Sequence, residues 1–149
     1  MNFLKAGMHK LPEYMQLRQA VESNALPAVA TGLSGIHKAT IINALVQDTN
    51  KTALLLAADE AEAQRICQDL TSMGLRSFIY PTRDFTFRNV ESASREYEHQ
   101  RIQVLSRILK HDCDVVVACM DAALQYTIPP NELEGRMIEL KKGQTVSLE

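Results

Sequence analysis

The sequence lacks several features that would place it in a specialised class of protein. No apolar run approaches the ~20 residues that a membrane-spanning helix needs, and the first ten residues lack the apolar core of a signal peptide. Lysine and arginine total 16 against 18 aspartates and glutamates, without the basic stripe that nucleic-acid binders usually carry. We therefore expect a cytoplasmic protein, away from membranes, with no general attraction for polyanions.

Cysteine is also scarce. Cys67, Cys113 and Cys119 lie inside apolar segments, no two of them are spaced as CxxC, and no Cys/His group has zinc spacing. This pattern favours reduced core thiols of a cytosolic protein over a metal or redox site. The sequence therefore predicts no metal site.

What is present is an alternation of strand-like and helix-like segments in a chain of 149 residues, 46% of them hydrophobic. The runs ALLLAA (53–58) and VVVA (115–118) are typical of strands covered on both faces. Shorter strands are predicted at 28–31 and 77–80, and helices at 12–24, 38–46, 59–74 and 94–111. This order predicts an α/β fold, a parallel sheet with helices on both faces.

Two of the predicted helices carry detailed signals. Asp59 and Glu62 form a capping box ahead of an apolar stripe that Gly74 ends. Ser94 is expected to cap the helix of 94–111. In that helix, the charged residues are interpreted as a solvated face and four aliphatic residues as the inward face. The charged set is Arg95, Glu96, Glu98, Arg101 and Arg107; the inward set is Ile102, Leu105, Ile108 and Leu109.

The pattern of residues changes after Tyr126, where we place a domain boundary. Residues 1–125 form the α/β domain, and residues 126–149 begin a following domain that is incomplete here. In this last part, residues 136–140 alternate like a strand and Lys141-Lys142-Gly143 is typical of a turn. We expect the parent protein to continue; the sequence does not indicate whether Leu148-Glu149 is native.

The segment 32–39 lies between a predicted strand and a predicted helix, where a phosphate-binding loop belongs. Phosphate loops have the pattern GxxxxGK followed by Ser or Thr. Gly32 and Lys38 match the first glycine and the lysine of this pattern, and Gly35 adds a second flexible point. His37 replaces the second glycine, so its Cβ crowds the backbone cradle. Ala39 replaces the hydroxyl that would bind Mg²⁺. The residues alone leave three interpretations open: a working site, a relic, or a plain strand-to-helix turn.

Other candidate chemistry is weak. Asp121 follows the apolar run 115–119, loosely like a metal-holding aspartate, but it is more simply a carboxylate at a helix start. His37, His99 and His111 could act as bases, yet no nucleophile lies beside them in sequence. We predict no catalytic residue in this chain.

Several stretches taken together resemble one protein family. They are TGLSGIHKA (31–39), ALLLAADEAEAQRICQDL (53–70), FIYPTRDFTFRNVESASREYEHQRIQVLSRIL (78–109), DVVVACMDAALQYTIPP (114–130) and LKKGQ (140–144). In this order they resemble the N-terminus of the bacterial transcription-repair coupling factors (Mfd), a region that is itself similar to the excision-repair protein UvrB. The resemblance runs from about Leu11 onward.

The resemblance implies a UvrB-like phosphate-loop domain of the RecA type that has lost ATP binding. The full protein would be an ATP-dependent DNA translocase that releases RNA polymerase stalled at DNA damage and recruits UvrA for nucleotide excision repair. Its motor, with ATP and Mg²⁺, and its contacts with RNA polymerase and DNA would lie downstream. UvrA would be bound mainly by the domain that begins near Pro129.

The leading hypothesis is therefore a non-enzymatic scaffold module that packs against the rest of its own protein and needs no cofactor. The alternative is a nucleotide-binding fragment of a helicase-like or kinase-like phosphate-loop enzyme. A nucleic-acid binder is disfavoured, because the family's nucleic-acid-touching position after the second strand is here the acidic segment 59–62.

Overall fold

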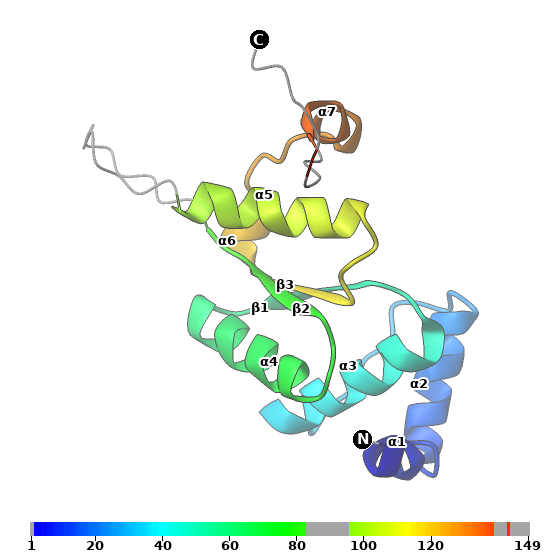
Figure 1. Cartoon of the computed structure of the whole chain (residues 1–149). Helices are drawn as coiled ribbons and strands as arrows, with labels where there is room; N and C mark the ends of the chain where they lie inside the picture. Colours follow the sequence, from blue (N-terminus) through cyan, green and yellow to red (C-terminus); the bar gives the residue numbers. More distant parts are fainter. Residues whose placement is uncertain (1, 83–95, 139–142, 144–149) are drawn as a thin grey trace.

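A small parallel sheet forms the centre of the protein (Figure 1). The computed structural model describes residues 2–82, 96–138 and 143. The strands are β1 (Ala53–Ala57), β2 (Ser77–Tyr80) and β3 (Val115–Cys119), in the order β1-β3-β2. Both outer strands run parallel to β3, and the first residue of each pairs with Val115. The predicted α/β class with a parallel sheet is confirmed.

Helices lie on both sides of this sheet. Helices α3 (Gly35–Thr49) and α4 (Glu60–Ser72) cover one face, and α5 (Glu96–Leu109) with α6 (Met120–Ala123) lies on the other (Figure 1). Side chains alternate between two core clusters along β3: Val115 and Val117 face α4, while Val116 and Ala118 face α5. This alternation explains why the VVVA run is apolar at every position: β3 is buried on both faces.

The first two helices are held against α3 by one carboxylate. Helices α1 (Asn2–Met8) and α2 (Pro12–Glu22) precede the sheet, and α1 was not predicted. Asp48 of α3 accepts hydrogen bonds from the Tyr14 hydroxyl at 2.7 Å and from His9 at 2.6 Å, and pairs with Lys5 at 2.8 Å. Its side chain is almost fully buried by these contacts. The N-terminal helices therefore depend on a polar anchor as well as on apolar packing.

Helix α4 follows its sequence signals closely. The Asp59 carboxylate accepts the Glu62 N–H at 2.7 Å, and the Glu62 carboxylate accepts the Ala58 N–H at 3.0 Å. Ala63, Ile66, Cys67 and Leu70 are buried, and Gly74 lies just beyond the helix with φ +90°. The capping box and the apolar stripe are confirmed.

The strand predicted at 28–31 is wrong. These residues are exposed and unpaired, and the exposed fraction of Val29 is 85%. Two of the four are alanine, a weak strand former. In addition, β3 already has a partner on each side, so the segment could only have joined the sheet at an outer edge.

Two burial predictions are also wrong. Strand β1 is covered on one face only, since Leu54 and Leu56 are 65% and 47% exposed. In α5, Ile102 and Ile108 are exposed, whereas Arg101, assigned to the solvated face, is 3% exposed. Arg101 stacks on the Tyr80 ring at 4.0 Å and donates to the Pro81 carbonyl at 2.7 Å. A cation buried among carbonyls and an aromatic ring leaves no trace in helical periodicity.

Helix α7 (Pro130–Arg136) follows the boundary predicted near Tyr126. It lies next to α5 (Figure 1), and Leu133 is buried. Arg136 ends this helix instead of opening an alternating strand, and residues 139 and 140 of that predicted strand, with 141 and 142 of the predicted turn, lie outside the described residues. The predicted cap Ser94 and the neighbouring Arg95 lie outside them as well. None of the helices in the described ranges is both long enough and apolar enough to cross a membrane.

Candidate functional site

The backbone of residues 32–39 is not arranged as in a phosphate loop. Gly32 adopts φ +76°, a conformation that favours glycine, and Ser34 is the N-cap of α3. The helix starts at Gly35, so His37, Lys38 and Ala39 all belong to its first turns. Because residues 28–31 form no strand, the strand that should precede such a loop is missing.

The lysine of the motif is engaged elsewhere. The Lys38 ammonium lies 3.4 Å from the Glu62 carboxylate, at the start of α4. The backbone hydrogen bond from Ala58, followed by the contact with Lys38, lowers the pKa of Glu62 below its usual range. His37 meets the Ser34 hydroxyl at 3.1 Å through its Nδ1. The polar side chains of the segment therefore bond to the protein itself.

Ala39 lies at the position where a phosphate loop has the Ser or Thr that binds Mg²⁺, and it is a core residue. Its exposed fraction is 0%, and it belongs to the cluster that α3, α4 and the sheet form together. A hydroxyl here would be buried among aliphatic groups instead of facing a nucleotide. The hydroxyl of the next residue, Thr40, donates a hydrogen bond to the Ile36 carbonyl at 2.8 Å, within α3.

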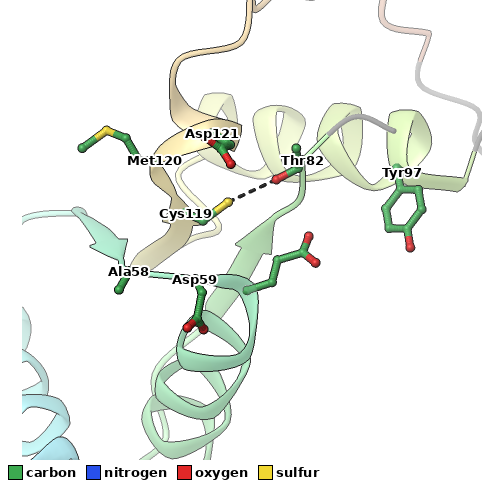
Figure 2. A pocket seen from close by; sticks show the side chains of 8 residues that line it. Ala58, Asp59, Thr82, Tyr97, Cys119, Met120 and Asp121 are labelled. Atoms are coloured by element: carbon green, nitrogen blue, oxygen red, sulfur yellow. Dashed lines mark hydrogen bonds between the residues drawn. The ribbon is translucent and has the colours of Figure 1, made fainter. Parts of the chain in front are cut away.

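A pocket of about 480 Å³ lies where β1 and β3 end (Figure 2). Parallel α/β sheets usually bind ligands in a crevice at the carboxyl ends of their strands. Asp59, the N-cap of α4, lines this pocket together with Tyr97 of α5 and with Met120 and Asp121 of α6. The Thr82 hydroxyl and the Cys119 thiol lie 3.1 Å apart and form a hydrogen bond, drawn as a dashed line in Figure 2. The lining residues are Ala58, Asp59, Glu60, Thr82, Tyr97, Cys119, Met120 and Asp121.

The described lining of this pocket is acidic. Among residues 2–82 and 96–138, it includes the three carboxylates Asp59, Glu60 and Asp121 but no lysine or arginine. The Asp59 carboxylate already holds the Glu62 N–H at the start of α4, a group that could otherwise face an anion. An unpaired cationic or neutral group fits this environment better than a nucleotide.

The other candidate residues come from different elements. Asp121 lies in the first turn of α6, while His99 lies on α5 and His111 just after it. Among residues 2–82, 96–138 and 143, no three His, Cys, Asp or Glu side chains cluster as metal ligands. All three cysteines are free and buried, as predicted, and burial raises the pKa of the Cys67 and Cys113 thiols. Raised thiol pKa values are typical of inert core cysteines.

One relative places the chain among known proteins. The transcription-repair-coupling factor of Bacillus subtilis (strain 168) is 32% identical to it over 104 residues, which cover 68% of this chain and 9% of that protein. This chain is related to a region of transcription-repair coupling factor. The likeness seen in the sequence is confirmed at that level, and the chain spans about a tenth of the relative's length. No protein-family profile matches the chain, and no solved structure matches it.

Proposed function

We propose that this chain is a non-enzymatic scaffold module of a transcription-repair coupling factor, descended from a phosphate-loop domain whose nucleotide site has decayed. One observation carries the proposal: the residue at the magnesium-ligand position, Ala39, is part of the core. The neighbouring Lys38 is paired with Glu62, and the crevice at the strand ends is acidic. Each of these features disfavours a nucleoside triphosphate with its metal.

Calorimetry with Mg·ATP tests this proposal. We expect no binding tighter than millimolar and no hydrolysis, because the segment offers neither a free cation nor a metal ligand. Micromolar affinity would contradict the scaffold role and favour the alternative, a nucleotide-binding fragment of a helicase-like or kinase-like enzyme. A Lys38→Ala variant then serves as the matched control: binding that survives this change would not occur at the phosphate-loop segment.

The role in repair belongs to the whole protein. We propose that the full polypeptide releases stalled RNA polymerase at DNA damage and recruits UvrA, and that its motor, with ATP and Mg²⁺, lies outside this chain. The name of the Bacillus relative supports a part in coupling repair to transcription. For these 149 residues, the binding partner that we propose is the rest of the same protein.

An experiment can test whether this chain itself binds UvrA. We propose that UvrA binds mainly to the domain that begins near Pro129, of which this chain holds only the start. A stable interface needs roughly 800 Å² per partner around a buried anchor cluster, which an incomplete domain does not present. Residues 1–149 alone should therefore capture little UvrA in a pull-down, while a longer polypeptide that includes the whole next domain captures it. Equal capture by both lengths would place the UvrA site within this chain.

A further inference from the structure

Outside the acidic pocket, one face of β1 is left uncovered by the described part of the chain. Leu54 and Leu56 point to the side of the sheet that α5 covers elsewhere, yet they remain 65% and 47% exposed. Parallel strands are ordinarily covered on both faces, because their crossover helices lie on both sides of the sheet. The continuous apolar run 53–58 is the kind of sequence that such a doubly covered strand has, although here one of its faces is exposed.

The uncovered face continues into a hollow of about 290 Å³ beside α5. Leu54 forms one wall, and Leu105 and Ile108 of α5 form the other, with Val116 and Ala118 of β3 and Ala123 of α6 among the remaining lining residues. None of the described residues that line it is charged, and its polar members are Thr52, Tyr80 and Thr127. Such a surface fits aliphatic side chains and excludes nucleic acid or a charged peptide.

Simple dimensions explain why α5 leaves this surface uncovered. A helix with its side chains is about 10–12 Å wide, whereas neighbouring strands are about 4.8 Å apart. One helix therefore covers about two strands, and α5 lies over β2 and β3. The third strand, β1, lies beyond the width of α5 and is contacted on this side by the four-residue helix α6, which is too short to cover it.

We propose that an amphipathic α-helix from the rest of the same polypeptide lies beside α5 and packs its aliphatic stripe on Leu54, Leu56 and Ile108. The inference rests on the proposed function, since it requires that this chain is a module of a longer protein. The length of the relative supports that source, because the region similar to this chain is only 9% of it. The interface is thus intramolecular and joins the module to its own protein.

Thiol labelling tests the proposal directly, because the native cysteines are buried. A cysteine replaces Leu54 in one variant (Leu54→Cys) and the exposed, polar Gln64 of α4 in the control (Gln64→Cys). Each variant is made in the 149-residue chain and in the product of the complete reading frame. We expect a maleimide to modify Leu54→Cys about tenfold more slowly in the complete protein, since reaction then awaits local opening, while Gln64→Cys reacts equally in both.

Each other outcome overturns the proposal. Equal labelling of Leu54→Cys in the two lengths means that no helix covers β1, and a reading frame that ends at Glu149 leaves no helix to do so. Protection in the 149-residue chain that grows with protein concentration makes a second copy the occupant. A Leu56→Cys variant, on the same face, guards against a local effect of one substitution. Failure of the Mg·ATP test would remove the scaffold role but leave these labelling rates, and the interface, unchanged.

Discussion

At the scale of single residues, the most informative position is Ala39. Its methyl group fills the core between α3, α4 and the sheet, so restoring the hydroxyl of a phosphate loop conflicts with packing. We expect Ala39→Thr to lower the free energy of unfolding by about 1–3 kcal/mol, because it adds volume and a hydroxyl to a closed core. Urea denaturation followed by circular dichroism measures this. Ala61→Thr, at an exposed position of α4, is the control and should cost only the small difference in helix propensity.

A second residue carries an unusual share of stability. Asp48 binds groups on both N-terminal helices, and its side chain is 3% exposed. We expect Asp48→Asn to reduce the free energy of unfolding by roughly 1–3 kcal/mol, since Lys5 and Arg18 lose their buried partner. The control is Glu22→Gln, which breaks the exposed pair with Arg18 and should change stability much less than Asp48→Asn does. Equal midpoints in urea for both variants would contradict this role.

The same carboxylate predicts a pH dependence. Burial alone would raise the pKa of Asp48, but hydrogen bonds from Lys5, Tyr14 and His9 together hold it well below its usual range. A carboxyl whose pKa is lowered by folding stabilises the protein above its unfolded pKa of about 3.9, and this stability is lost as the pH falls toward the folded pKa. The gap in unfolding free energy between wild type and Asp48→Asn should therefore narrow from pH 6 to pH 3. A gap of constant size over this range would argue against the lowered pKa.

At the scale of elements, α4 offers a clean test of a helix start. The Asp59 carboxylate holds the Glu62 N–H at 2.7 Å, so Asp59→Ala should destabilise the protein by about 1 kcal/mol. Glu60→Ala changes a carboxylate in the same turn that is not the capping residue, and it should cost less. Midpoints of urea unfolding compare the two. The reverse order would show that charge near the helix start matters more than the cap hydrogen bond.

The elements also show how far the sequence predicted the fold. Helix α4 was predicted well, because its cap, stripe and terminating glycine are all local signals within one segment. Burial was predicted poorly, because it depends on neighbours far along the chain. The run that forms β1 is as apolar as that of β3, yet only β3 has a strand on each side and a helix on each face. Arg101 is a second case, since the carbonyls and the Tyr80 ring that receive it come from other elements.

The candidate site, too, was only partly predictable from the sequence. The substitutions His37 and Ala39 are visible in the sequence, and they predicted a segment unsuited to nucleotide, a prediction that awaits measurement. The pairing of Lys38 with Glu62 and the burial of Ala39 required the structure, because they join α3 to α4 across the fold.

At the scale of the whole molecule, charge decides which partners are attracted. The net charge is −2, and the crevice at the strand ends is lined by three carboxylates. We therefore expect no binding of duplex or single-stranded DNA at physiological salt, since such binding depends on cations that displace counterions. Fluorescence anisotropy with labelled oligonucleotides measures this. Saturable binding at low micromolar protein would contradict the expectation and restore a nucleic-acid role.

The strand order also has a consequence for synthesis on the ribosome. The two outer strands are made first, but neither pairs with the other, because β3 lies between them. No strand pair can therefore form until residues 115–119 have left the exit tunnel. Until then, α4 has no completed sheet to pack on, and the apolar runs of β1 and β2 stay open to chaperones or to other nascent chains. A nonsense codon or a ribosome stall before Val115 would release a chain without a sheet, which favours its degradation over its accumulation.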